Sequence, residues 1–198
     1  RMSRTATLHR QTAETEVRLS LDLDGSGSGS RLTGVGFFDH MLDLLARHGG
    51  LDLDVQVQGD LATGAHHTVE DTGLVLGHAI HDALGDRSGI TRYGHAVVPM
   101  DEARAAAAVD LSGRPFLVLE GGVPAGVTGD FEHELLEEFL RAVSTTGRFT
   151  LHVSIEAGTN AHHVIEACFK ALARALREAV AIDPRQEGVP STKGTLTT

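Results

Sequence analysis

The chain has 198 residues, of which 41% are hydrophobic, with a formal net charge of −10 and 12 histidines. This composition fits one compact globular domain or two small ones, and the single cysteine excludes an internal disulfide framework. The acidic balance, with no Trp and one Tyr, argues against nucleic acid as a partner. No apolar run approaches a membrane span and the first residues lack a signal-peptide core, so we expect a cytoplasmic protein with no membrane partner.

The first half of the chain alternates patterns of period two with patterns of helical spacing. Apolar residues at every second position indicate half-buried strands, and apolar residues three and four apart indicate helices with one buried face. The predicted elements are a strand over 17–23, a turn or short loop over 25–30, a helix from Phe37 to Gly49–Gly50, a strand over 51–57 and a long helix from Val69 to near Gly85.

The second half repeats this order, which indicates an internal duplication. The segment GAHHTVE at 64–70 matches NAHHVIE at 160–166 with an offset of 96 residues, and the strand over 53–57 matches 151–155 with an offset of 98. The predicted elements of this half are strands over 105–111 and 116–119, a helix over 135–143, a strand over 151–155 and a long helix over 164–180.

The duplication predicts the fold class. We expect an α+β fold of two similar halves, each a sheet with helices packed on one face. We place the halves at 1–94 and 95–198, each with one copy of a His-His-x-x-Glu motif, and expect them to form one intertwined catalytic domain.

Each motif opens a long helix. Residues four apart share a helix face, so His66 with Glu70, and His162 with Glu166, are each suited to hold one ion. Adjacent histidines diverge by about 100° around the axis, so His67 and His163 must point elsewhere, which suggests a metal shared across an interface. A single copy would more often be surface or cap histidines; two copies in register favour a metal.

The repeat also selects a partner for His40. At an offset of 98 the apolar positions of the two preceding helices superpose, and His40 falls on Glu138. His133 would require an offset of 93, which places Met41 on a glutamate and breaks the apolar pattern. We therefore predict that Glu138 is a metal ligand and that His133 is a solvated residue on the helix surface.

Eight candidate ligands divide into two sites of four, which leaves open positions on six-coordinate ions. Imidazole and carboxylate donors without thiolate fit Mn, Fe, Co or Zn, and open positions indicate catalysis. A dinuclear metallohydrolase acting on a small phosphate ester and a metal-storage or metal-sensing protein are the alternatives. The ligands are His40, His66, His67, Glu70, Glu138, His162, His163 and Glu166.

Six segments of the chain, in order, resemble the imidazoleglycerol-phosphate dehydratase family in its monofunctional form. They are GFFDHMLDLLARHGG (36–50), HHTVEDTG (66–73), PMDEA (99–103), DLSGRP (110–115), HHVIEACFKALARALR (162–177) and PSTKG (190–194). The resemblance implies a lyase of histidine biosynthesis that dehydrates D-erythro-imidazole glycerol phosphate to imidazole acetol phosphate. It also implies two Mn(II) ions per active site, which hold the substrate imidazole or imidazolate at subunit interfaces. The assembly it implies is a homo-oligomer in which trimers form a 24-subunit shell.

The resemblance further implies roles for individual residues. Members of the family often have His where this chain has Glu138, and the loop 63–65 lacks acidic residues common there. The sequence leaves open whether Asp101 and Glu102 transfer protons or support the site. The implied catalytic residues are Glu14, His48 and Lys170, and the implied contacts to the substrate phosphate are Arg92, Arg114, Ser191, Thr192 and Lys193.

Overall fold

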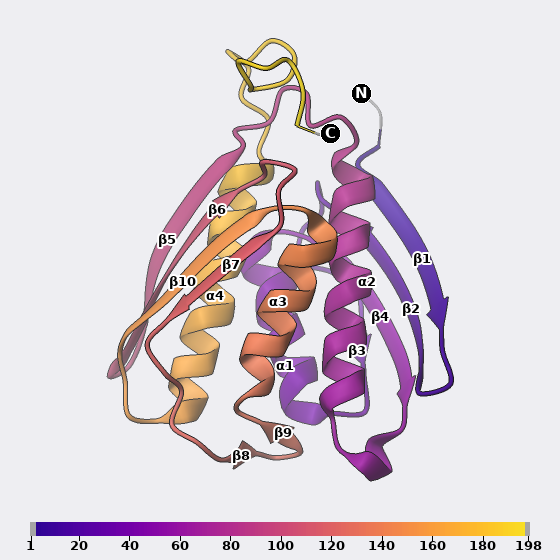
Figure 1. Cartoon of the computed structure of the whole chain (residues 1–198), viewed down its shortest axis with the longest axis vertical. Coiled ribbons are helices and arrows are strands. Elements are labelled where there is room, and N and C mark those ends of the chain that lie inside the picture. Colours follow the sequence, from indigo (N-terminus) through magenta and orange to yellow (C-terminus); the bar gives the residue numbers. More distant parts are fainter. Residues whose placement is uncertain (1–2, 197–198) are drawn as a thin grey trace.

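Two four-stranded sheets lie on opposite sides of four long helices (Figure 1). The computed structural model describes residues 3–196. The elements of the first half are β1 (Thr5–Gln11), β2 (Thr15–Asp22), β3 (Arg31–Leu32), α1 (Gly36–Gly49), β4 (Asp52–Gly59), a short 3-10 turn (Leu61–Thr63) and α2 (His66–Leu84). Those of the second half are β5 (Tyr93–Met100), β6 (Ala103–Asp110), β7 (Phe116–Glu120), β8 (Val127–Thr128), β9 (Phe131–Glu132), α3 (Leu135–Gly147), β10 (Thr150–Ala157) and α4 (Ala161–Val180).

The two sheets have the same topology. The first has the strand order β1-β2-β4-β3 and the second β5-β6-β10-β7. In each, the last pair is parallel and the others are antiparallel. Helix α2 covers the first sheet and α4 the second, while α1 packs against α4 and α3 against α2. The predicted α+β fold with two similar halves is confirmed.

The sequence patterns located the inner strands but not every outer one. β2 was predicted because Val17, Leu19 and Leu21 are buried while their neighbours are less so. β1 and β5 were missed. Each lies at the edge of its sheet, and β1 has no buried residue at all, so its alternation is between half-buried and exposed positions. An edge strand with so little burial leaves only a weak hydrophobic signal.

One hydrophobic core runs through both halves. At its centre the ring of Phe139 on α3 lies 5.5 Å from that of Phe38 on α1 and 5.0 Å from that of Phe169 on α4. Aromatic pairs at this spacing contribute about 0.5–1.5 kcal/mol beyond their burial. Helices from both halves are therefore held to each other by the same side chains. None of the helices within residues 3–196 combines the length and apolar character needed to span a bilayer.

The Gly-Ser run over 25–30 forms the predicted loop and is tightly held. The carboxylate of Asp52 accepts hydrogen bonds from the backbone N–H groups of Ser26 and Ser28, and these bonds lower its pKa. Gly29 has φ +108°, and a Cβ there would lie 2.3 Å from the carbonyl oxygen of Leu53. The loop is therefore an ordered support for β4 that requires glycine at this position.

The structure confirms the register of the duplication between α1 and α3. Helix α1 ends at Gly49 with Gly50 in the left-handed conformation, and α3 ends at Gly147 with Arg148 in the same conformation. Both pairs are separated by the offset of 98 residues found in the sequence. His40 and Glu138 consequently occupy equivalent positions on their helices.

Candidate active site

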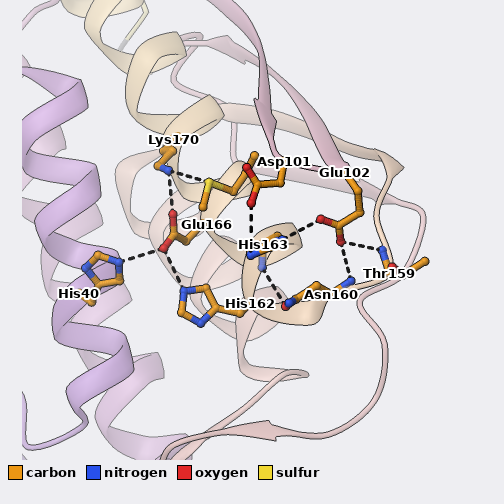
Figure 2. A network of polar contacts seen from close by, with 10 residues as sticks. His40, Asp101, Glu102, Thr159, Asn160, His162, His163, Glu166 and Lys170 are labelled. Atoms are coloured by element: carbon orange, nitrogen blue, oxygen red, sulfur yellow. Dashed lines mark hydrogen bonds and ion pairs between the residues drawn. The ribbon is translucent and has the colours of Figure 1, made fainter.

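Three candidate ligands from α1 and α4 meet at one point (Figure 2). Nε2 of His40 and Nε2 of His162 each lie 3.0 Å from the same oxygen, Oε1 of Glu166. One donor atom from each residue lies within 4.8 Å of the other two. His162 and Glu166 share a face of α4 as predicted, and the packing of α1 against α4 brings in His40. We call His40, His162 and Glu166 the three-donor cluster.

The electrostatics of the three-donor cluster suit a cation. Burial alone would raise the pKa of Glu166, but hydrogen bonds from Lys170, His40 and His162 lower it to about 2. The Lys170 ammonium lies 2.7 Å from Oε2, and the Glu166 side chain is only 7% exposed. A buried, ionised carboxylate beside two imidazoles is a donor set that fits Mn(II), Fe(II), Co(II) or Zn(II).

The second histidine of the later motif has a carboxylate on each side. Nδ1 of His163 lies 2.7 Å from Oε2 of Glu102, while Nε2 lies 3.9 Å from Asp101 (Figure 2). The hydrogen bond to Glu102 raises the pKa of His163, and the same bond together with backbone N–H donors lowers the pKa of Glu102 to about 2. His162 and His163 contact different carboxylates, those of Glu166 and Glu102, so the predicted divergence of adjacent histidines is confirmed.

The second histidine of the earlier motif has the same environment. Nδ1 of His67 lies 2.9 Å from Oδ2 of Asp60, and Nε2 lies 3.6 Å from Glu14. The Asp60 hydrogen bond raises the pKa of His67. The ring is inclined at 84° to that of His66. In both halves, therefore, one nitrogen of the ring is held from behind by a carboxylate and the other faces outward.

The earlier motif does not assemble a three-donor cluster of its own within residues 3–196. Nε2 of His66 lies 3.6 Å from Oε2 of Glu70, as predicted for an i, i+4 pair, but Glu70 is 41% exposed. In the described chain no hydrogen bond or ion pair of the Glu138 side chain is found. Glu138 is partly buried on α3, at the position equivalent to His40. Its role as a ligand stays a prediction.

His133 is not the solvated helix residue that we predicted. It precedes α3 and is only 8% exposed. Its Nδ1 lies 2.7 Å from the carbonyl oxygen of Pro124, and its Nε2 lies 2.9 Å from the hydroxyl of Thr128. The ring holds the loop that leads to β8 and β9, and both nitrogens already have partners. The expectation that it is not a ligand is consistent with this arrangement.

The candidate phosphate contacts gather around Asp110 at the end of β6. Arg92 donates to both oxygens of Asp110, at 2.8 and 3.2 Å, and to the carbonyl oxygen of Pro190 at 2.9 Å. Arg114 is 64% exposed and reaches Asp110 only at 3.8 Å. Pro190 leads directly into the remaining candidates, which are Ser191, Thr192 and Lys193.

Within one chain, the candidate phosphate contacts lie far from the three-donor cluster. Glu102, which contacts His163, directly precedes β6, and Asp110 ends it. An eight-residue strand separates its ends by about 23 Å. Figure 1 shows the same separation, with the start of α4 at the bottom of the view and the C-terminal segment at the top. The two sets of residues lie at opposite ends of the molecule.

The three candidate catalytic residues are divided between two places. Glu14, in the turn between β1 and β2, faces His67. Lys170 contacts Glu166 of the three-donor cluster. His48 lies near the end of α1, where burial and then the positive charges of Lys170 and Arg174 lower its pKa. His48 and Lys170 thus share a neighbourhood, while Glu14 belongs to the environment of the other motif.

Two contacts of the motif histidines were not predicted from the sequence, namely those of His67 with Asp60 and of His163 with Glu102. Asn160, whose side chain accepts a hydrogen bond from the backbone N–H of His163, was also missed as the cap of α4. An Asn one residue before an apolar helical pattern is a recognisable cap signal. Asp60 gave no comparable signal, because its contact depends on the path of the loop between β4 and α2.

Comparisons with known proteins agree over nearly the whole chain. The sequence profile described as imidazoleglycerol-phosphate dehydratase matches residues 33–176. The proteins of that name from Acidiphilium cryptum and Moorella thermoacetica are 57% and 56% identical, each over 98% of this chain and 100% of their own length. The crystal structure of the Staphylococcus aureus protein superposes with a TM-score of 0.82 at 38% identity, covering 90% of this chain and 99% of the other. The Pyrococcus furiosus protein, in complex with (S)-C348, gives 0.83 at 35% identity, covering 96% and 100%.

Proposed function

The chain belongs to the imidazoleglycerol-phosphate dehydratase family, and from that premise we propose how it uses metal ions and its own side chains. Membership makes it a lyase that dehydrates imidazoleglycerol phosphate in histidine biosynthesis. We propose D-erythro-imidazole glycerol phosphate as the substrate, imidazole acetol phosphate as the product, and two Mn(II) ions per active site as the cofactors.

The observation that carries the metal proposal is the three-donor cluster. His40, His162 and Glu166 present two imidazoles and one ionised carboxylate within 4.8 Å of one another. Bound there, Mn(II) would act as a Lewis acid and template that holds the substrate imidazole as imidazolate, so that the ring could help to expel the hydroxyl group on the carbon beside it. The chain's one thiol, Cys168, is buried and has a pKa raised to about 12 by burial, so it does not compete as a ligand.

The remaining ligands follow from the duplication. Glu138 is equivalent to His40, and the pair His66 and Glu70 is equivalent to His162 and Glu166. We assign these three residues to the second ion. His67 and His163 direct one nitrogen away from their own motifs, and we assign them to ions shared with neighbouring copies.

The chain's own acidic and basic groups move the protons. Dehydration expels the hydroxyl group on the carbon beside the imidazole ring as water and removes a proton from the next carbon, which gives an enol that becomes the ketone of the product. Glu14 is 55% exposed and faces His67, so its carboxylate is accessible to take up or return a proton. The Lys170 ammonium, 2.7 Å from Glu166, and His48 are suited to contact the substrate next to the three-donor cluster.

The distance between the two sets of residues supports assembly. A substrate the size of a glycerol phosphate with one imidazole ring does not extend over the length of β6, about 23 Å. Residues at the phosphate end, with Arg114 and its largely exposed guanidinium among them, would therefore complete the site of a neighbouring copy. This supports active sites at subunit interfaces, and we propose that the interfaces are those of trimers that form a 24-subunit shell. We propose that this assembly is cytoplasmic.

An activity assay with controlled metal content tests the proposal. The protein is stripped with a chelator, and the ketone product and inorganic phosphate are measured on imidazole glycerol phosphate, with and without added Mn(II). We expect product only with Mn(II) and no free phosphate. Full activity in the stripped protein would exclude a metal role, and release of inorganic phosphate would indicate a hydrolase.

A further inference from the structure

We propose that Glu102 and Asp60 are positioning residues that fix the tautomers of His163 and His67. In each case a carboxylate behind the ring holds the hydrogen on Nδ1, which leaves the Nε2 lone pair facing outward. This inference rests on the proposed metal function, because an outward Nε2 lone pair is what a metal ion requires. It resolves the open role of Glu102 in favour of orientation rather than proton transfer.

Both carboxylate oxygens of Glu102 have hydrogen-bond partners. Oε1 accepts from the backbone N–H of Asn160 at 2.7 Å and from that of Thr159 at 3.2 Å, while Oε2 lies 2.7 Å from Nδ1 of His163 (Figure 2). An ionised carboxylate can only accept. Nδ1 must therefore carry a hydrogen, and in the neutral ring the lone pair is on Nε2.

Asp60 makes the same bond from a position unrelated by the duplication. The strand pairings align Leu19 of β2 with Ala107 of β6, since both face equivalent valines of β4 and β10. The repeat counterpart of Glu102 is therefore Glu14, and Asp60 lies instead after β4. The two halves thus hold their second histidine by carboxylates of different origin. Inheritance from one ancestral half does not explain that agreement, whereas a shared requirement for the tautomer does.

This difference also explains the position of Glu14. Because Asp60 is behind His67, Glu14 is not needed there and faces Nε2 at 3.6 Å. In the second half, Asp101 takes the corresponding outward position, 3.9 Å from Nε2 of His163. Each of these histidines therefore has one carboxylate that orients it and one on its outward side.

The substitution Glu102→Gln provides a sharp test, because it should invert the tautomer of His163. The two backbone N–H groups can be satisfied only by the amide oxygen, so the amide NH₂ turns toward Nδ1. Nδ1 must then accept, and the ring hydrogen moves to Nε2, where it blocks a metal. The matched variant Asp60→Asn should not invert His67. Among the described residues, the only other partner of Asp60 Oδ2 is the rotatable hydroxyl of Thr63, so the amide oxygen can remain on Nδ1.

Two measurements test whether the tautomer of His163 is inverted and whether metal binding is weakened. Solid-state NMR of the metal-free, ¹⁵N-histidine-labelled protein, recorded two to three units above the ordinary histidine pKa of about 6.5, reports the tautomers directly. Titration with Mn(II), followed by the EPR signal of the free ion, reports affinity. We expect Glu102→Gln to convert one histidine to the Nε2–H form and to weaken one class of Mn(II) site by about 10–100-fold. Glu156→Gln, an exposed carboxylate paired with Arg104, is the control and should change neither.

The outcomes separate the two proposals. An unchanged His163 tautomer in Glu102→Gln overturns the positioning role, whatever the metal affinity. An inverted tautomer with unchanged Mn(II) affinity in a wild type that binds Mn(II) also overturns it, because Nε2 would then not be the ligand atom. A wild type that binds no Mn(II) removes the proposed metal function, while the tautomer measurement still decides whether Glu102 orients the ring.

Discussion

The contrast between Glu138 and His133 can be tested by a pair of substitutions with opposite effects. His133→Ala removes two hydrogen bonds, to Pro124 and Thr128, from a ring that is 8% exposed. At about 0.5–1.5 kcal/mol each, we expect a loss of about 1–3 kcal/mol in the free energy of unfolding. For a chain of this length that lowers Tm by about 2–12 °C. Mn(II) affinity should be unchanged, because both ring nitrogens are already engaged.

Glu138→Gln should behave in the opposite way. In the described part of the chain its side chain makes no hydrogen bond or ion pair, so the stability of the metal-free protein should change by less than about 0.5 kcal/mol. Loss of a direct ligand should weaken Mn(II) binding by at least about 10-fold, the lower limit for a supporting group. Thermal unfolding of the metal-free protein and EPR titration of free Mn(II) measure the two effects. Glu137→Gln, an exposed neighbour paired with Arg141, is the control.

The opposite ranking would refute the reasoning. Suppose that His133→Ala released the metal and Glu138→Gln did not. The backbones of α1 and α3 would then correspond at an offset of 98 residues, but their ligand positions would not. Equal retention of metal by both variants would remove Glu138 from the ligand set and leave the second site with fewer protein donors.

Further predictions concern the stability of the fold. Arg87 is fully buried and donates to the carbonyl oxygens of Leu111, Gly147 and Arg148, so Arg87→Met should cost about 3–5 kcal/mol in urea unfolding. A loss below about 1 kcal/mol would contradict this. Gly29→Ala should cost about 1–3 kcal/mol, because of its positive φ and the nearby Leu53 carbonyl. Burial, and then the charge of Arg87, lower the pKa of His81. The folded state therefore binds fewer protons, and stability should fall as the pH drops below about 6.5. His81→Gln, which keeps an acceptor for Arg87, should show a smaller fall; identical pH profiles would refute this.

Much of the fold could be predicted because burial on one face imposes a period on the sequence. The inner strands and all four long helices were found in this way, and the repeat of the HHxxE motif located two His–Glu pairs that each share a helix face. The edge strands β1 and β5 were missed because they bury so little. Hydrophobic periodicity also could not predict contacts that depend on the path of a loop. Asp60 and His133 both lie in such segments, and their partners are set by rotamers and turns rather than by periodicity.

The duplication gives two helix pairs, α2–α3 and α1–α4, that have diverged. The first is specialised for close packing and the second for the chemistry of the site. In the α2–α3 pair, Gly73 and Gly77 of α2 allow α3 to approach so closely that a Cβ on Gly77 would lie 2.1 Å from the hydroxyl of Thr146. That hydroxyl donates to the carbonyl oxygen of Leu74 at 2.7 Å.

The repeat places His48 at the position of Thr146, and Lys170 at that of Leu74. The hydroxyl that closes the α2–α3 contact is thus replaced by a histidine between α1 and α4, where Lys170, beside the three-donor cluster, also stands in place of Leu74. We therefore expect substrate contacts on the α1–α4 side only. The α2–α3 pair would then supply ligands to an ion but no surface for the substrate, and we expect one active site, not two, from the duplicated chain.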